Sequence, residues 1–310
     1  MKYIEISNLF KSFGDVTAIE NLNLSIEKGE IFGLLGPNGA GKSTTINILC
    51  SLLEKDRGSI KICNKELRKN DASTRGKLGI VPQDLAIFEN MTALENVMFF
   101  GSLYGLKGQD LKNKALEALN FVGLEDTKKL SKTFSGGMKR RLNIACGIVH
   151  NPELLILDEP TVGIDPQSRN HIMKSIKTLN KNGCTVIYTT HYMEEVEAIC
   201  NNIAIIDKGK VIGSGTKESL KGLITDKNKF EVMVNDITEI NEKELSDIRW
   251  IDSVEFKDNR ILVSIDREIN SLNEFILYLT DKSIKILDIQ SKVSTLEDVF
   301  LNLTGRKLRD

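Results

Sequence analysis

The feature that most constrains the fold of this chain is a loop at positions 36–43, which reads Gly-Pro-Asn-Gly-Ala-Gly-Lys-Ser. It fits the pattern G-x-x-x-x-G-K-[ST] and lies between an apolar run at 31–35 and a helical pattern, the context in which such a loop binds phosphate. Its glycines let the backbone turn tightly and bring N–H groups against phosphate oxygens. Lys42 would bring a positive charge to the β- and γ-phosphates, and Ser43 would offer a hydroxyl to Mg²⁺. The loop predicts a nucleoside triphosphate site at the end of a strand, without saying which kind of triphosphatase carries it.

Size and composition exclude several other classes of protein. The 310 residues correspond to roughly two domains, and 41% hydrophobic with 27% charged residues is usual for a folded globular protein. A net charge of −1 argues against a nucleic-acid partner bound through bulk charge. The sequence contains no apolar run of about 18 residues for a membrane span and no apolar core of a secretion signal. The five cysteines are scattered without a C-x-x-C pair, which predicts reduced thiols rather than disulfides or a zinc site.

Up to about residue 225, short apolar runs alternate with longer helical patterns. The runs at 31–35, 154–157 and 185–188 are continuously apolar, which suits parallel strands covered on both faces. Residues 22–26 instead alternate between apolar and polar, as a half-exposed strand does. Strands that alternate with helices predict an α/β domain with a largely parallel sheet. The helical patterns cover 42–53, 92–105, 110–122, 136–149, 166–182 and 192–199.

The rhythm changes after a linker at about 222–229. The order strand, helix, strand, strand, helix, strand predicts a small α+β domain of the ferredoxin-like arrangement, with Asp258 and Asn259 as the turn between its middle strands. A last helix follows, because Ser294 and Glu297 have the S-x-x-E spacing of a capping box. The expected elements are strand 229–235, helix 241–248, strand 252–257, strand 260–266, helix 271–281 and strand 284–290.

Two acidic residues follow the apolar run at 154–157. Ligand sites in open α/β sheets lie at the carboxyl ends of strands, so Asp158 is the expected Mg²⁺ ligand. Neighbouring residues of a regular strand point to opposite faces, but Pro160 stops this strand, and Glu159 can therefore turn toward the same site. A carboxylate near the γ-phosphate can accept a proton from an attacking water. Taken alone, the pair could also be two acids that cap a strand in solvent.

Further motifs follow in a definite order along the chain. A Ser-Gly-Gly segment at 135–137 opens a helical pattern between the phosphate loop and Asp158. Gln83 lies in Ile-Val-Pro-Gln-Asp, Asp165 ends Val-Gly-Ile-Asp, and His191 directly follows a predicted strand. This set of motifs, in this order, resembles the nucleotide-binding subunit of ABC transporters, whose signature is Leu-Ser-Gly-Gly-Gln.

The resemblance implies a fold and a mode of pairing. The fold is α/β: an ABC-type P-loop ATPase domain over 1–225, with a RecA-like core, an antiparallel β subdomain and a helical subdomain at about 84–150. A C-terminal ferredoxin-like accessory domain with its terminal helix would span 226–310. Two ATPase domains of this family pair head to tail, so that each ATP lies between the phosphate loop of one subunit and the signature of the other. A glycine-led helix N-terminus suits that contact with the γ-phosphate, because it is an anion site without side-chain obstruction.

The resemblance also implies roles for single residues. Glu159 would activate the attacking water, and His191 would contact the γ-phosphate and hold the water. Gln83 would sense Mg²⁺ and link the site to the membrane partner, while Asp165 would lie at the dimer seam and could also cap the helix that begins at Pro166. The implied catalytic residues are Glu159, His191, Lys42 and Gln83, the implied Mg²⁺ ligands are Ser43, Gln83 and Asp158, and the implied ATP contacts are Phe13, Gly36, Pro37, Asn38, Gly39, Ala40, Gly41, Lys42, Ser43, Thr44, Ser135, Gly136, Gly137 and Asp165.

The sequence departs from the family pattern at two positions. Phe13 stands where the family usually has the tyrosine that stacks on adenine, so the ring is kept and the hydroxyl is lost. Met138 replaces the glutamine of the signature and cannot make its hydrogen bonds. The Lys-Arg-Arg run at 139–141 is expected to be a solvated helix face rather than a nucleic-acid patch.

The signature variant Ser-Gly-Gly-Met-Lys-Arg-Arg-Leu and the tail at 294–305 resemble the subfamily that energises bacterial drug and antibiotic exporters. The implied partners are a separate membrane permease, which would contact the region around 92–104, and a second copy of the chain or a related ATPase chain. No nucleic-acid partner is expected, and the place of action would be the cytoplasmic face of the membrane. The alternatives are an importer ATPase, or a soluble ABC ATPase that acts on ribosomes or DNA. The sequence has no Asn-Lys-x-Asp motif, which argues against a GTPase.

Overall fold

The computed structural model describes residues 1–68, 72–124, 128–223, 227–238, 240, 244–245, 248–266, 271–292 and 295–305. Through their internal contacts these residues form two compact units, Met1–Lys217 and Glu218–Gly305. Each unit has its own hydrophobic core. In the described part of the chain, no helix is both long enough and apolar enough to span a membrane.

The first unit contains two β-sheets. Their strands are β1 (Lys2–Phe13), β2 (Val16–Glu27), β3 (Ile31–Leu35), β4 (Arg57–Ile62), β5 (Lys65–Glu66), β6 (Leu78–Val81), β7 (Leu154–Asp158), β8 (Thr185–Thr189), β9 (Asn202–Asp207) and β10 (Lys210–Thr216). The larger sheet has the order β10-β9-β3-β8-β7-β6, and all of its neighbours pair in parallel except β10, which lies antiparallel at one edge. The smaller sheet is antiparallel, with the order β2-β1-β4-β5.

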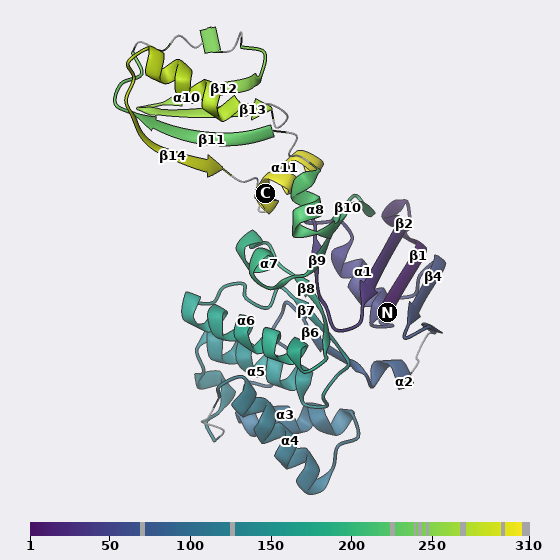
Figure 1. The fold of residues 1–310 in the computed structure, drawn as a ribbon. Coiled ribbons are helices and arrows are strands. Elements are labelled where there is room, and N and C mark those ends of the chain that lie inside the picture. Colours follow the sequence, from purple (N-terminus) through teal and green to yellow (C-terminus); the bar gives the residue numbers. More distant parts are fainter. Residues whose placement is uncertain are drawn as a thin grey trace. The chain divides into compact units, whose positions relative to one another are not determined.

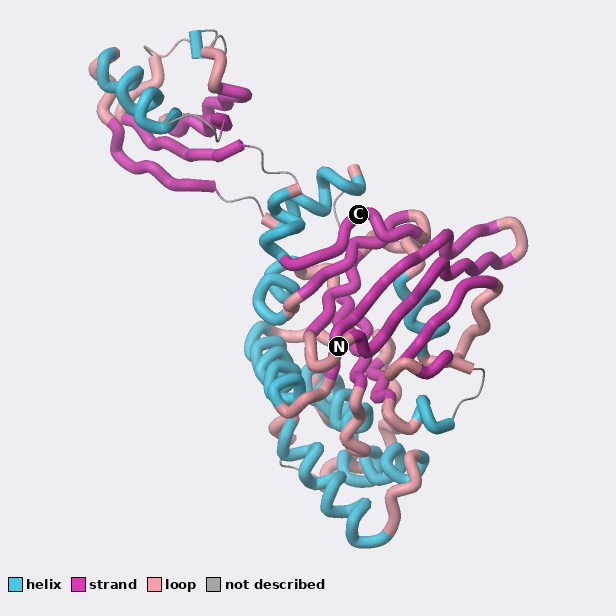
Figure 2. The backbone as a smooth tube through the Cα atoms, turned by 45° about the vertical axis from the view of Figure 1, so that its right-hand side comes forward, coloured by secondary structure: helices cyan, strands magenta, loops and turns pink. Residues whose placement is uncertain are grey.

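The helices of the first unit are α1 (Lys42–Leu49), α2 (Ala72–Arg75), α3 (Ala93–Leu103), α4 (Gly108–Phe121), α5 (Gly136–Ile148), α6 (Pro166–Lys181) and α7 (Met193–Ile199), with a 3₁₀ turn at Ser131–Thr133. Helices α3, α4 and α5 contact one another, and α5 also contacts α6 and β6. Figure 1 shows this group of helices at one end of the unit. In Figure 2 the strands (magenta) gather at the other end, next to the helices (cyan). A further helix, α8 (Lys217–Gly222), begins at the last residue of the first unit.

The burial of the strands confirms the sequence patterns. Every residue of β3 and β8 is buried, and so are the first four residues of β7, as expected for parallel strands covered on both faces. In β2, burial alternates over residues 22–26, as predicted for a half-exposed strand. The cysteines are free thiols, four of them buried, which agrees with the prediction of reduced cysteines.

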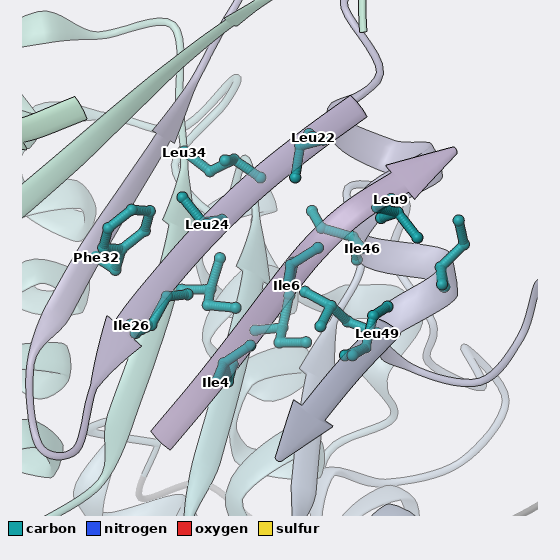
Figure 3. Close-up of a cluster of buried hydrophobic side chains, with 14 of the residues drawn as sticks. Ile4, Ile6, Leu9, Leu22, Leu24, Ile26, Phe32, Leu34, Ile46 and Leu49 are labelled. Atoms are coloured by element: carbon teal, nitrogen blue, oxygen red, sulfur yellow. The ribbon is translucent and has the colours of Figure 1, made fainter. Parts of the chain in front are cut away.

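A shared apolar core joins the antiparallel sheet to α1. Figure 3 shows the side chains from β1, β2, β3 and α1 that lie together in it, namely Ile4, Ile6, Leu9, Leu22, Leu24, Ile26, Phe32, Leu34, Ile46 and Leu49. Burying one such aliphatic side chain contributes about 1.5–3 kcal/mol to folding. The cluster therefore fixes α1, and with it the loop that precedes α1, against both sheets.

Helix α1 is shorter than predicted. The pattern indicated a helix over 42–53, but α1 ends at Leu49 and Cys50 caps it. Ser51 has a φ of 56°, in the left-handed region, and the backbone N–H of Leu52 turns back to the carbonyl of Asn47. These turn contacts end the helix although the next residues are apolar, and Leu52 is left 67% exposed. The other predicted helices of this unit are observed within two residues of their expected ends.

The second unit contains one antiparallel sheet with the order β12-β13-β11-β14. This is the order that a β-α-β-β-α-β unit forms when its two outer connections cross the sheet. The core is apolar, with Phe275 and Leu279 packed among strand residues such as Val232 and Val263. The elements are β11 (Lys227–Val234), β12 (Ile251–Lys257), β13 (Arg260–Asp266), α10 (Ser271–Asp281), β14 (Ile286–Lys292) and α11 (Leu296–Thr304).

Most predicted boundaries of the second unit agree with the structure. Asp258 adopts a φ of 53° in the predicted turn, between paired Lys257 and Arg260. Strand β14 begins two residues later than predicted, because Ile284 still bonds back to Leu279 at the end of α10. The helix predicted over 241–248 lies mostly outside the described residues.

The predicted capping box at Ser294 and Glu297 is wrong by one residue. The N-cap of α11 is Thr295, whose hydroxyl accepts from the backbone N–H of Asp298, while the Asp298 carboxylate accepts from the backbone N–H of Thr295. Thr-x-x-Asp has the same spacing as Ser-x-x-Glu, and the sequence offers both patterns side by side. Ser294 itself lies outside the described residues.

Candidate active site

Four neighbouring strands of the larger sheet bring the predicted site residues together. Strands β3, β8, β7 and β6 are adjacent in that order and parallel. The carboxyl ends of parallel strands lie at the same edge of a sheet, where α/β folds bind ligands. Strand β3 continues into the phosphate loop, and the other three lead to His191, to Asp158 and Glu159, and to Gln83. The strand order thus explains why segments far apart in the sequence meet at one place.

The phosphate loop has no room for side chains at two of its glycines. A Cβ on Gly36 would lie 2.3 Å from the carbonyl oxygen of Ile206. Gly41 has a φ of 105°, and a Cβ there would lie 2.6 Å from the carbonyl oxygen of Ala18. Both contacts are with backbone atoms that cannot move aside without moving a strand. The glycines of the motif are therefore required by the fold of the loop.

Lys42 is held inside this loop. Only 7% of the residue is exposed, and its Nζ donates to the carbonyl oxygens of Gly36 at 2.6 Å and Pro37 at 3.1 Å. Burial lowers the pKa of the Lys42 ammonium, while the nearby Glu159 and Asp158 carboxylates act in the opposite direction. A bound phosphate would add negative charge beside the ammonium and so favour its charged form.

One threonine holds both acids at the end of β7. Thr189 Oγ1 donates to Asp158 Oδ1 at 2.6 Å and accepts from the backbone N–H of Glu159 at 3.0 Å. Glu159 is only 5% exposed and has a φ of 49°, in the left-handed region. Such a conformation costs about 1–3 kcal/mol in a residue other than glycine. Despite this cost, Glu159 departs from the alternating side-chain directions of the strand, as the sequence predicted.

Glu159 and His191 are in direct contact. His191 Nε2 lies 2.6 Å from Glu159 Oε1. The second carboxylate oxygen of Glu159 and Nδ1 of His191 are both buried without a hydrogen-bond partner among the described residues. Buried polar atoms are nearly always satisfied in folded proteins, so these two mark a place where water or a ligand completes the bonding.

These groups surround one cavity. It has a volume of about 260 Å³, and its lining comprises Ala18, Asn38, Gly39, Ala40, Gly41, Lys42, Ser43, Thr44, Gln83, Glu159 and His191. Oxygen ligands suit Mg²⁺, and Ser43 and Gln83 bring a hydroxyl and an amide carbonyl to this cavity. Asp158 does not line it but is joined to Glu159 through Thr189. The cavity combines a phosphate loop, a buried cation and a buried carboxylate, which is the equipment for phosphoryl transfer to water.

Phe13 does not line this cavity. It ends β1 with half of its surface exposed, and Lys11 Nζ lies 5.4 Å from the centre of its ring. Its contact with adenine therefore stays a prediction.

The Ser-Gly-Gly segment forms an exposed helix start away from this cavity. Ser135 caps α5 by accepting from the backbone N–H of Met138 at 3.3 Å, and Gly136 is exposed. Gly137 is buried instead. A Cβ there would lie 2.4 Å from Ser168 Oγ and 3.2 Å from Asp165 Oδ2, so the position has no room for a side chain. None of the three residues of the segment lines the phosphate cavity of its own chain.

Asp165 caps α6, as the sequence predicted. Its Oδ1 accepts from the backbone N–H of Ser168 at 2.9 Å, and Pro166 occupies the first turn. This hydrogen bond lowers the pKa of the Asp165 carboxyl.

The prediction of a solvated helix face at 139–141 is wrong for Arg140. Arg140 is only 6% exposed, and its guanidinium donates to the carbonyl oxygens of Pro82 at 3.1 Å and Gln83 at 2.8 Å. Arg141 likewise donates to backbone carbonyls after α4. A sequence pattern cannot show this, because the acceptors are backbone atoms from distant segments. The helix that begins at the Ser-Gly-Gly segment therefore anchors the loop that carries Gln83.

Comparison with known proteins gives consistent results. The sequence profile of the ABC transporter family matches residues 19–162. A linearmycin resistance ATP-binding protein of Bacillus subtilis is 44% identical over 310 residues, which cover 99% of this chain and 100% of the relative. A Nod factor export ATP-binding protein I of Sinorhizobium fredii is 35% identical over 314 residues, with 99% of this chain and 87% of the relative covered. A solved ATP-binding cassette, dimeric in a post-hydrolysis state and bound to ADP and Pi, matches 69% of this chain and 98% of its own with a TM-score of 0.62 and 30% identity.

The fold and the site define a P-loop nucleoside triphosphatase, with its phosphate loop, buried lysine and strand-end acid at one edge of a parallel sheet. The chain belongs to the ABC transporter family, and within it to the ATP-binding subunits, which hydrolyse ATP. The family resemblance drawn from the sequence is thereby confirmed.

Proposed function

We propose that this chain is the ATP-hydrolysing subunit of an exporter, that it works as a head-to-tail pair, and that it drives a separate permease from the cytoplasmic face of the membrane. The observation that carries the proposal is the division of the site. The phosphate cavity holds Lys42, Glu159 and His191, while the exposed Ser135 and Gly136 lie outside it. A second copy, or a related chain, would bring its own Ser-Gly-Gly segment to the γ-phosphate and complete the cavity.

The residues at the strand ends support distinct roles. The loop N–H groups and Lys42 bind and orient the phosphates, and Glu159 accepts a proton from the attacking water on its unpartnered oxygen Oε2. His191 holds Glu159 through their 2.6 Å contact and can meet the γ-phosphate. Ser43, Gln83 and Asp158 are the residues that would hold Mg²⁺. When bound, Mg²⁺ supplies positive charge beside the phosphate oxygens.

The permease has a candidate contact surface on the first unit. A groove of about 280 Å³ is lined by Pro82, Phe100, Leu103, Tyr104 and Cys146, among others. Nearby apolar side chains on the same segments are exposed, notably Leu85, Phe88, Phe99 and Leu103. Apolar groups that gather on a surface mark interaction sites. The groove adjoins the loop of Gln83, so a partner helix seated there would be coupled to the ATP site.

The export direction rests on the relatives. One of them is a linearmycin resistance protein and another a Nod factor export protein, and both match nearly the whole of this chain. The second name states export, and removal of an antibiotic from the cell is one way in which an ATP-binding protein can give resistance. The transported compound is set by the permease, so neither name assigns the substrate of this chain.

The deciding experiment purifies tagged Glu159→Gln protein from gently solubilised native membranes with ATP present, and identifies the chains that accompany it. A hydrophobic chain with several membrane spans is expected. Leu103→Glu in the same background should lose this chain, whereas Leu277→Glu, which changes an exposed leucine of the second unit, should keep it. Recovery of ribosomal or DNA-bound material only, or of nothing besides the protein itself in repeated trials, would overturn the exporter proposal.

A further inference from the structure

A buried carboxylate lies behind the active site without lining the cavity. Glu195, on α7, is only 1% exposed. A single oxygen of this carboxylate, Oε2, accepts hydrogen bonds from the hydroxyl groups of Thr161 at 2.8 Å, Tyr188 at 2.8 Å and Thr190 at 2.7 Å. The other oxygen forms an ion pair with Nε of Arg169 at 3.4 Å but has no hydrogen-bond partner among the described residues.

A carboxylate buried this deeply would destabilise the fold if it lacked polar partners. A buried carboxylate must be paired and hydrogen-bonded, because its transfer out of water costs several kcal/mol. All three hydroxyl groups donate to the same oxygen, so Oε2 of Glu195 is the shared acceptor of this cluster. Burial and the nearby Glu195 charge raise the pKa of Tyr188 well above its usual range, so its phenol stays a donor.

The partners of Glu195 flank the catalytic pair in the sequence. Thr161 follows Glu159 by two residues, and Thr190 directly precedes His191. Thr190 Oγ1 also accepts from the backbone N–H of residue 192 at 3.0 Å, so the same hydroxyl group contacts the backbone that follows His191. One carboxylate oxygen therefore ties together the two loops that carry the 2.6 Å contact between Glu159 and His191.

We propose that Glu195 is a positioning residue for ATP hydrolysis, which keeps Glu159 and His191 in fixed relative position. It sets the rate of turnover and has little effect on ATP affinity, because the phosphate loop does not depend on its hydrogen bonds. This inference rests on the roles proposed above for Glu159 and His191.

The test compares Glu195→Gln with Glu194→Gln. The two residues are neighbours on α7, but Glu194 is exposed and serves as the matched control. The amide of Gln has the size of the carboxylate, yet its nitrogen cannot accept a hydroxyl hydrogen. In one orientation of the amide group that Glu195→Gln introduces, its nitrogen faces the three hydroxyl donors, and in the other orientation the nitrogen faces the guanidinium of Arg169. We expect kcat for ATP to fall about tenfold to a hundredfold, with KM for ATP changed by less than about twofold.

A second pair of variants separates positioning from folding. Thr190→Val has nearly the size of threonine but cannot donate to Glu195, whereas Thr190→Ser keeps the hydroxyl. The valine variant should lose turnover and the serine variant should restore most of it, both with nucleotide binding intact. A general packing role would not follow the hydroxyl in this way. This pair decides the question if Glu195→Gln fails to fold.

Each outcome decides one proposal. Three results would overturn the positioning role. The first is an equal kcat for Glu195→Gln and Glu194→Gln, and the second is a rise in KM at unchanged kcat. The third is equal activity of Thr190→Val and Thr190→Ser. Glu159→Gln is measured alongside. If that variant still hydrolyses ATP, the proposed role of Glu159 fails. If it is inactive while Glu195→Gln is fully active, the inference about Glu195 alone fails.

Discussion

The two compact units of this chain both pack helices on β-sheets, but they bury different chemistry. In Met1–Lys217, charged or polar side chains such as Lys42, Arg140, Glu159 and Glu195 are under a tenth exposed. In Glu218–Gly305, Ser264 is the only polar side chain buried to this degree among the described residues. Buried charges cost free energy unless something pairs them. The first unit therefore buries charged groups that need polar partners, and the second unit is stabilised mainly by apolar packing.

Backbone strain follows the same division. Among the described residues of the second unit, those with left-handed φ other than glycine are Asp258 and Ser283, which lie in turns between elements, where such residues are common. In the first unit, Glu159 adopts this conformation as a buried acid beside His191. Glu159 differs from the turn residues of the second unit because it combines this conformation with burial and with the contact to His191, and such a combination points to function.

Glu159→Gln gives the largest expected effect. We expect ATP hydrolysis to fall by at least about a hundredfold, because a neutral amide cannot accept the proton of the attacking water. ATP binding should remain and the paired state should persist. Thermal stability should be unchanged or higher, since the variant removes a buried charge. Turnover and thermal unfolding, measured together against Glu194→Gln, check both parts. Normal hydrolysis would remove Glu159 from the mechanism, and a large loss of stability would contradict the comparison.

Phe275→Ala is the reciprocal case in the second unit. Phe275 is completely buried in an apolar core, so the unit should lose about 3–5 kcal/mol of stability. ATP hydrolysis at room temperature should remain, because every residue that lines the phosphate cavity belongs to Met1–Lys217.

The chain offers a probe for this experiment. Its single tryptophan, Trp250, packs against the core of the second unit, so its fluorescence during urea unfolding reports on that unit. Leu277→Ala, on the same helix but 60% exposed, is the control and should change stability by less than about 0.5 kcal/mol. If Phe275→Ala lowers both the urea midpoint of the tryptophan fluorescence and the rate of ATP hydrolysis, the two units do not act independently.

Gly137→Ala tests how tightly the starts of α5 and α6 pack against each other in the first unit. A Cβ on Gly137 would lie 2.4 Å from Ser168 Oγ and 2.9 Å from Ser168 Cβ, which would push the starts of α5 and α6 apart. We expect a loss of about 1–3 kcal/mol in the stability of the first unit. The added Cβ of Gly136→Ala would meet no atom of the described residues within 4 Å, and this variant should gain stability from its better helix propensity. Equal thermal midpoints for the two variants would mean that α5 is free to shift.

The sequence alone predicted the parts of the site that local patterns determine. The phosphate loop, the strand-end acids and the cap at Asp165 need only a short stretch of chain, and the structure has them where expected. Arg140 and Glu195 were not predicted as buried links, because their partners are backbone carbonyls and hydroxyls from other segments. The early end of α1 was missed for the same reason that Thr295 was passed over as a cap. In both places two local patterns compete, and the structure forms the turn after Leu49 and the capping box at Thr295.

The last prediction concerns pH and separates the two units by their histidines, all three of which lie in the first unit. His150 stacks on Tyr104 with ring centres 3.5 Å apart, and its Nε2 lies 3.0 Å from the carbonyl oxygen of Leu78. Burial lowers the pKa of His150 from 6.5 to about 4. Its Nδ1 is buried without a partner among the described residues, so a proton placed there would have no acceptor.

Between pH 6.5 and about 4, the unfolded chain binds a proton at His150 that the folded chain does not. The folded state therefore loses stability as pH drops through that window, whereas above about pH 6.5 neither state binds this proton and stability no longer changes with the charge of His150. In His150→Gln, the stability of the first unit should depend less steeply on pH than in the parent, measured by urea unfolding at about pH 5 and about pH 7.5. Trp250 fluorescence, which follows the second unit, should give the same pH dependence in both proteins. Parallel pH profiles for the first unit would show that His150 is protonated as easily in the fold as out of it. A change in the tryptophan signal would show that the two units do not unfold independently.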